Sequence, residues 1–388
     1  MPVINRIAEF HNDMKEWRQH LHSIPELSFE LHKTASYVAD KLREFGVDEL
    51  HEGIARTGMV AIINGQGDGP TIGLRADMDA LPITEIKDHA YKSQNPGTMH
   101  ACGHDGHTTM LLGAARYLAE TRNFKGRVAL IFQPAEEGGG GGQVMCQEGI
   151  MDTFKISQVY GVHNAPNIPL GMFLANSGPV LAAADTFQVH IKGRGGHGAS
   201  PEETVDPVMV AVNLAQMIQT ITSRNVSAMD NLVISVTQIH TGTVNNIIPS
   251  DAFVEGTVRT LKKEVQATVV KRLEEICAGV GAAFGAKAEL VYEYGYPPTV
   301  NHKDQTDFAA GVARGVVGDD KVNAEFPPVM GAEDFAYMLE ERPGAYLMIG
   351  QGAGAVLHHA EYDFNDELSP IGASYFVKLV ENAQPLRA

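Results

Sequence analysis

The chain has 388 residues, 44% hydrophobic and 20% charged, a composition typical of globular proteins with large buried cores, and its length suggests two or three folding units. The formal net charge of −17 argues against a nucleic-acid partner, because phosphate recognition needs clustered Lys and Arg and the longest cluster is Lys262–Lys263. No apolar run is long enough for a membrane span. Three cysteines form no disulfide framework and the polar N-terminus is unlike a secretory signal, so we expect a cytoplasmic protein.

The first and last thirds of the chain have the pattern of an α/β domain. Residues 1–45 have helical apolar spacing that Gly46 ends. Apolar strands then alternate with helices, which predicts a central mixed sheet covered on both faces. The predicted strands are 58–64, 71–77, 127–134 and 345–350, and the predicted helices are 108–120, 305–317 and 369–383.

The middle of the chain has a different pattern, in which strands of period two predominate. The predicted strands are 185–193, 231–242, 251–261 and 287–296, with helices at 205–224 and 263–284. The order β-α-β-β-α-β is typical of a ferredoxin-like domain. We therefore expect this domain at 183–294, inserted into a discontinuous catalytic domain of residues 1–182 and 295–388.

The stretch Met99–His107, MHACGHDGH, concentrates side chains that bind metals. Cys102 and His104 are separated only by Gly103, so a thiolate and an imidazole can reach one divalent ion. The helix expected from Thr108 would favour the thiolate over the thiol. An isolated C-x-H pattern is more often a buried cysteine beside surface histidines, so the metal prediction depends on further polar clusters.

A second cluster, QPAEEGGGGG, places Glu136 and Glu137 directly after a predicted strand. Neighbouring side chains in irregular backbone diverge, so one carboxylate can bind metal while the other faces the water that the metal activates. Such a carboxylate is the usual general base of metal-assisted hydrolysis. Taken alone, the pair is equally compatible with a solvated acidic turn.

Other candidate residues also follow apolar runs. His163 ends one, and His358 and His359 end another. Asp77 and Asp79 lie at the end of a predicted strand, where the active site of an α/β protein is usually found.

Together these motifs resemble one enzyme family. LRADMDALPI, MHACGHDGHT, QPAEEGGGG, GVHN, GRGGHGASP, NIIP, GAEDF and LHHAEYDFND are similar to those of hippurate hydrolases, N-acyl-amino-acid deacylases and plant auxin-conjugate hydrolases. Those enzymes belong to the aminoacylase and carboxypeptidase G superfamily of two-metal enzymes. The likeness extends from residue 17 to the last helix. It implies a catalytic domain of zinc-peptidase type with an inserted lid and dimerisation domain.

The resemblance also implies roles for individual residues. The general base is Glu136, and Asp79 is the carboxylate that orients a ligand from behind. His197, from the partner subunit, helps to hold the substrate, with contributions from Asn245 and Asn246. The implied metal ligands are Cys102, His104, Glu137, His163 and a C-terminal histidine, for which the register from Tyr362 favours His358 over His359 although Ala360 replaces the family's proline.

The predicted cofactor is a pair of divalent ions, Zn, Mn, Ni or Co, because imidazole and thiolate suit these metals better than Mg or Ca. Cys102 is the expected bridge, since a neutral imidazole offers one lone pair. The predicted activity is hydrolysis of N-acyl amino acids, such as N-benzoyl or N-acetyl conjugates, by a homodimer or larger homo-oligomer. A dipeptidase or an N-acetyl-diaminopimelate-type deacetylase is the alternative enzyme. A metal-stabilised binding or scaffold protein is the alternative from another class, and the second carboxylate, Glu136 beside Glu137, argues against it because a closed structural site needs none.

Overall fold

The computed structural model describes residues 3–386 and divides the chain into two compact units. The first unit contains residues up to Val180, Val300–Pro327 and the chain from Asp334 onward. The second contains Leu181–Thr299 and Pro328–Glu333, so the predicted insert, 183–294, lies within it. A ribbon of β7 (Gly178–Leu181) and β14 (Thr299–Asn301) carries the chain from one unit to the other.

The first unit is built on one eight-stranded mixed sheet, which confirms the predicted α/β fold with a central mixed sheet. Its four inner strands are parallel to one another. Beside them, β2 runs antiparallel to β4, and β1 runs antiparallel to β2. In spatial order the strands are β1 (Glu49–Ile54), β2 (Gly58–Asn64), β4 (Arg127–Gln133), β3 (Thr71–Asp77), β5 (Ile156–Pro166), β16 (Gly344–Gly352), β6 (Phe173–Leu174) and β15 (Val322–Asn323).

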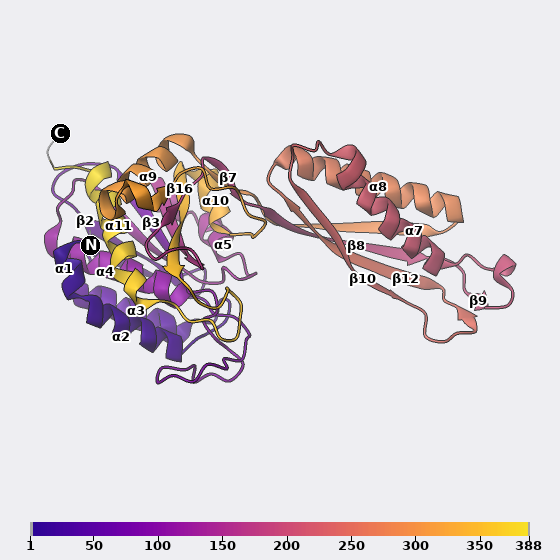
Figure 1. Ribbon diagram of the computed structural model, residues 1–388, viewed down its shortest axis with the longest axis horizontal. Coiled ribbons are helices and arrows are strands. Elements are labelled where there is room, and N and C mark those ends of the chain that lie inside the picture. Colours follow the sequence, from indigo (N-terminus) through magenta and orange to yellow (C-terminus); the bar gives the residue numbers. More distant parts are fainter. Residues whose placement is uncertain (1–2, 387–388) are drawn as a thin grey trace. The chain divides into compact units, whose positions relative to one another are not determined.

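Helices cover both faces of this sheet (Figure 1). Residues 58–63 of β2 are all buried, with Met59, Ala61 and Ile63 in the core that contains α4. Such continuous burial requires a covered sheet. The helices are α1 (Asn5–Glu9), α2 (His11–Ser23), α3 (His32–Phe45), α4 (His104–Thr121), α5 (Gly141–Gln147), α6 (Ile150–Thr153), α9 (Lys303–Val317), α10 (Phe335–Glu341) and α11 (Ser369–Ala383). Among the described residues, no helix is both long and apolar enough to cross a membrane.

The start of α4 differs from the prediction. The helix begins at His104 rather than near Thr108, after Gly103 in the left-handed conformation (φ 97°). Its first turn is polar and its apolar side chains begin only at Met110, so the periodicity could not reveal it. An added Cβ at Gly103 would lie 2.5 Å from Asn164 Oδ1, which explains the glycine at this close approach.

The four parallel strands β4, β3, β5 and β16 end at one edge of the sheet. The loops that follow them there contain residues 78–103, 134–140 and 353–368. This edge therefore collects the motifs that the sequence analysis singled out, as expected for a parallel sheet.

The second unit is a four-stranded antiparallel sheet with two helices on one face. Phe187, Val189 and Ile191 alternate with more exposed residues along β8 and pack in one core with α7 and α8. The elements follow the predicted order: β8 (Ala183–Lys192), α7 (Pro207–Thr220), β10 (Leu232–Thr241), β12 (Asp251–Thr260), α8 (Lys263–Phe284) and β13 (Lys287–Tyr296). The helix predicted at 205–224 ends at Thr220 and is followed by a π-helical turn, Ile221–Asn225.

Candidate metal centre

Five side chains from four separate loops and strands meet at the carboxyl edge of the first unit's sheet. Cys102 and His104 come from the segment that leads into α4, Glu137 from the loop after β4, His163 from β5 and His358 from the loop after β16. Cys102 Sγ lies 3.5 Å from His163 Nε2, and Glu137 Oε1 lies 3.2 Å from His358 Nε2 and 3.9 Å from His104 Nε2. These are the five residues expected as ligands.

The five side chains form two overlapping triads. In one, Cys102, His104 and His163 place their ligand atoms within 4.8 Å of one another, and in the other Cys102, Glu137 and His358 do so. Cys102 belongs to both. Glu136 lies in a third group of the same size with His104 and Glu137. Its buried carboxylate is therefore beside the ligands, in keeping with a division of labour between the two adjacent glutamates.

Two residues with positive φ shape the loops of this site. Ala135 (φ 54°) lies between Pro134 and Glu136, and His358 has φ 63°. Such values are uncommon outside glycine and occur mainly where the surrounding structure imposes them. The backbone N–H of His358 donates a hydrogen bond to the carbonyl of Ala101 at 2.8 Å. His359 is exposed and its Nδ1 accepts the N–H of Glu361, so it points into its own turn.

Asp79 contacts two of the candidate ligands from behind. Its main-chain carbonyl accepts a hydrogen bond from His104 Nδ1 at 2.9 Å, and its Oδ2 accepts the backbone N–H of Glu137 at 3.0 Å. The first bond assigns the proton to Nδ1 and leaves Nε2 of His104 to face the cluster, as happens for histidines that bind metals.

Sequence reasoning missed a second buried chain of contacts behind the site. His107 Nδ1 donates to Asp77 Oδ1 at 2.6 Å, and His107 Nε2 lies 2.7 Å from Asn164 Oδ1. The side-chain amide nitrogen of Asn164 donates to the Tyr362 hydroxyl at 2.7 Å. The main-chain carbonyl of Asn164 accepts from His163 Nδ1 at 2.7 Å. Asp77 and His107 both lie within motifs that the sequence analysis recognised. Their hydrogen bond could not be predicted, because it depends on α4 beginning at His104.

Burial and neighbouring charges set the protonation of the cluster. Burial lowers the pKa of His163 to about 3, so its imidazole is neutral. Burial raises the pKa of the Cys102 thiol well above its ordinary value, so burial opposes the thiolate that the helix terminus favours. Burial also opposes ionisation of Glu137, but the hydrogen bond with His358 lowers its pKa below the ordinary value.

The donor set fits a divalent cation. His104 Nε2 is buried and has no hydrogen-bond partner among residues 3–386, a costly arrangement unless something else binds it. A cation would bind that nitrogen and would offset the penalty of ionising buried Cys102. Imidazole, thiolate and carboxylate are the ligands of zinc and of similar transition metals.

The three predicted substrate-binding residues belong to the second unit. His197 lies on β9 (Gly196–His197), which pairs with β11 (Ile247–Ile248). Asn246 accepts the backbone N–H of Gly198 at 2.9 Å, so His197, Asn245 and Asn246 are close together and all three are exposed.

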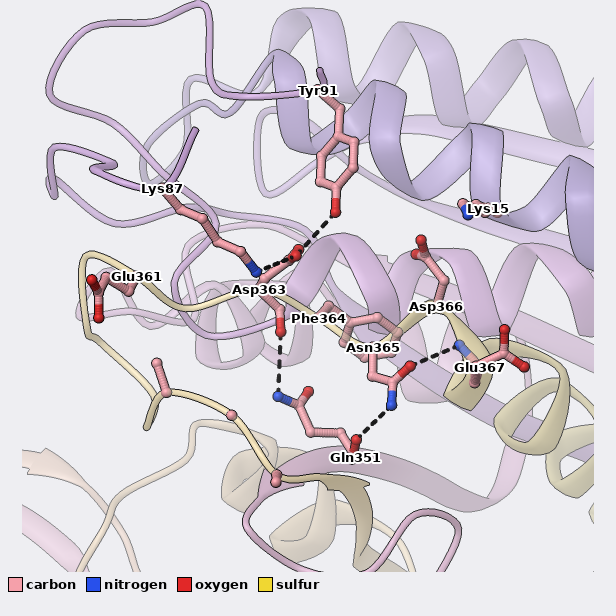
Figure 2. A pocket seen from close by; sticks show the side chains of 13 residues that line it. Lys15, Lys87, Tyr91, Gln351, Glu361, Asp363, Phe364, Asn365, Asp366 and Glu367 are labelled. Carbon is pink, nitrogen blue, oxygen red and sulfur yellow. Dashed lines mark hydrogen bonds and ion pairs between the residues drawn. The ribbon is translucent and has the colours of Figure 1, made fainter. Parts of the chain in front are cut away.

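A separate pocket of about 360 Å³ lies next to the loop that carries His358. It contains none of the five candidate ligands. Figure 2 shows Lys87 and Tyr91 directed at Asp363 in its wall.

Comparison with known proteins agrees with this geometry. The sequence model of Peptidase family M20/M25/M40 matches residues 73–382. Hippurate hydrolase of Campylobacter jejuni subsp. jejuni is 38% identical over 98% of each chain, and N-acetylcysteine deacetylase of Bacillus subtilis is 37% identical over 95% of this chain and 96% of that one. The crystal structure of the Bacillus subtilis YXEP protein, described as a dinuclear metal binding peptidase from the M20 family, superposes with a TM-score of 0.86 at 32% identity, covering 97% of this chain and 99% of the other.

Proposed function

The chain belongs to peptidase family M20/M25/M40, and we propose that it is a two-metal amidohydrolase that releases a carboxylic acid and a free amino acid from N-acyl amino acids. The single observation that carries this proposal is the sharing of Cys102 by two ligand triads, with the carboxylate of Glu136 beside them. The names of the relatives, hippurate hydrolase and N-acetylcysteine deacetylase, support the substrate class.

The two triads indicate which residues would hold the ions. Cys102, His104 and His163 would hold one ion, and Cys102, Glu137 and His358 the other. The shared position would suit a thiolate that contacts both ions, because sulfur can bind two metals while a neutral imidazole offers one lone pair. Zinc, nickel, cobalt or manganese would fit, and ligand softness favours the first three.

When bound, two such ions would polarise the substrate carbonyl and lower the pKa of a water molecule. Glu136 takes the proton from the attacking water and returns it to the departing amine. Asp79 fixes the ring of His104 and the backbone of Glu137 through its two hydrogen bonds, so the ligands are oriented before substrate arrives.

The second unit completes the proposal as a lid and dimerisation domain. His197 would stabilise the oxyanion that forms on the substrate, from the partner subunit of a homodimer, and Asn245 and Asn246 would contact the same substrate. The exposure of all three side chains supports a role in binding something outside their own domain. Three unpaired cysteines support a cytoplasmic location for the enzyme.

The decisive experiment is Glu136→Gln in metal-loaded protein. We expect amidase turnover on N-acetyl and N-benzoyl amino acids to fall by about 10² to 10⁴-fold while metal content stays at two ions per chain. Glu148→Gln, in the same unit but bonded to Ala55 N, is the control and should retain turnover. Unchanged turnover in the Glu136 variant at full metal content would refute the catalytic assignment.

Substrate class and assembly need separate measurements. A panel of N-acetyl, N-benzoyl and dipeptide substrates should show highest kcat/KM on an N-acyl amino acid, whereas a preference for dipeptides would favour the dipeptidase alternative. Mixing inactive Glu136→Gln with inactive His197→Ala protein should restore activity if His197 acts across the dimer. No recovery after demonstrated subunit exchange would place the complete site in one chain.

A further inference from the structure

Helix α2 buries two polar side chains for which the proposed chemistry has no use. Arg18 and His22 lie one turn apart and both are fully buried. Burying a charge is costly unless it is paired and hydrogen-bonded, so their partners indicate what the fold requires of them. Those partners lie in the two segments that carry metal ligands.

His22 joins α2 to the segment of Cys102 and His104. Its Nδ1 donates to Asp105 Oδ2 at 2.8 Å, and its Nε2 donates to Glu85 Oε1 at 3.1 Å. Asp105 is the residue after His104, in the first turn of α4. Burial lowers the pKa of His22, but the bonds to Asp105 and Glu85 outweigh it and raise the pKa to about 9.

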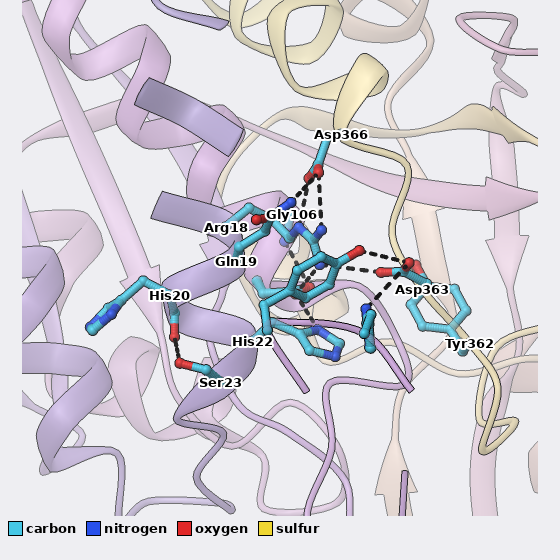
Figure 3. A network of polar contacts seen from close by, with 12 residues as sticks. Arg18, Gln19, His20, His22, Ser23, Gly106, Tyr362, Asp363 and Asp366 are labelled. Carbon is cyan, nitrogen blue, oxygen red and sulfur yellow. Dashed lines mark hydrogen bonds and ion pairs between the residues drawn. The ribbon is translucent and has the colours of Figure 1, made fainter. Parts of the chain in front are cut away.

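Arg18 contacts the same carboxylate and also the loop that carries His358. It binds Asp366 through two nitrogens, at 2.6 and 3.1 Å, and Asp363 at 3.3 Å, while its Nη1 lies 3.7 Å from Asp105 Oδ2. Figure 3 shows the guanidinium directed at Asp363 and Asp366. Both aspartates follow His358 by five and eight positions in the same loop.

We propose that Arg18 is a positioning residue for the metal centre: it joins the segment of Cys102 and His104 to the loop of His358 and so holds the two ligand triads together. His22 shares this positioning role, because it holds Asp105, the carboxylate that both side chains contact. The inference rests on the proposed function, because it assigns metals to those triads. The planar guanidinium contacts Asp366 through two nitrogens and still reaches Asp363 and Asp105; an ammonium, which has three donors and no fixed fork, cannot make all of these contacts.

The network itself is not a third ion site. His22, Glu85 and His89 also place ligand atoms within 4.8 Å of one another. However, His22 already donates to a carboxylate through each ring nitrogen, and an imidazolium has no lone pair for a metal. We therefore expect the wild-type protein to hold two ions per chain. If it holds a third ion, and His89→Ala loses that ion, this description is contradicted.

The first test compares Arg18→Lys with Arg116→Ala by zinc competition against a chromophoric chelator. Arg116 is a matched control, because it also links α4 to α2, through Asp13 at 2.6 Å, but contacts neither ligand segment. Partners that orient metal ligands are typically worth ten- to a hundredfold in metal affinity. We expect Arg18→Lys to hold zinc about tenfold or more weakly and Arg116→Ala to match wild type within about twofold.

A second pair of variants decides the question if Arg18→Lys does not fold. The amide nitrogen of Asn lies near the position of imidazole Nδ1 and that of Gln near Nε2, so His22→Asn keeps a donor for Asp105 and His22→Gln keeps one for Glu85. We expect His22→Asn to bind zinc about as tightly as wild type and His22→Gln to bind it about tenfold more weakly. Saturating zinc should restore the activity of both variants. Circular dichroism establishes that each variant is folded.

The outcomes separate this inference from the proposed function. If wild type holds two ions and the folded Arg18 and His22 variants hold them equally tightly, Arg18 and His22 have no positioning role. If the variants melt at lower temperature but keep wild-type zinc affinity, the network serves stability alone and the inference is again overturned. If wild type holds no zinc, manganese, nickel or cobalt, the proposed function itself fails.

Discussion

The backbone N–H of His358 donates to the carbonyl oxygen of Ala101 at 2.8 Å. This bond joins the loop after β16 to the segment that carries Cys102 and His104, although the two are far apart in the sequence. His358 has a positive φ (63°), and its imidazole lies 3.2 Å from Glu137. A main-chain contact between two loops thus brings one triad together.

The two adjacent histidines of this loop should behave differently. We expect His358→Ala to lower metal content from two ions to one per chain, because the second triad loses a ligand, and His359→Ala to leave it unchanged. Elemental analysis after gel filtration measures both. Equal loss of metal in the two variants would show that both histidines contribute to binding, and full metal content in both would show that either can serve.

Gly103 is expected to tolerate no side chain. In Gly103→Ala the new Cβ would lie 2.5 Å from Asn164 Oδ1 and 2.6 Å from Tyr362 OH, at φ 97°. A strained backbone of this kind costs about 1–3 kcal/mol before the overlap is counted, so the urea unfolding midpoint should fall. The control Gly311→Ala, in α9 with nothing within 4 Å of the added Cβ, should be neutral or stabilising.

Removal of metal should destabilise the first unit. An ion that binds only the folded chain stabilises it by about 2.7 kcal/mol at a hundredfold excess over its dissociation constant. Dialysis against a chelator should therefore lower the melting temperature, and zinc should restore it. In the Cys102→Ser protein, the melting temperatures before and after chelation should differ much less. An undiminished difference in melting temperature would mean that the stabilising ion binds elsewhere.

The buried His22 should make stability depend on alkaline pH. Its pKa is about 9 in the folded chain against 6.5 as the ordinary value, so its contribution is complete below pH 6.5 and is lost as pH rises through 9. The shift corresponds to about 3 kcal/mol. Urea unfolding at pH 6 and pH 9.5 should show a larger loss for wild type than for His22→Gln. Parallel losses in the two proteins would assign the pH dependence to other groups.

Much of the architecture follows from local patterns in the sequence. The strands β2 and β3 and the helix α11 have the predicted bounds. The two strands are buried on both faces, so each appears in the sequence as a short continuous apolar run. The metal-binding types of Cys102 and His104 were equally evident, since ligand chemistry depends on residue type and short spacing.

Other features depended on the order of strands in space. Only the arrangement β4-β3-β5-β16 brings Glu137, His163 and His358 to one edge of the sheet, where a backbone bond joins His358 to Ala101. The partners of Arg18 lie hundreds of residues away along the chain. Polar contacts of that kind leave no periodic signal, because they depend on where distant loops meet after the apolar faces have packed.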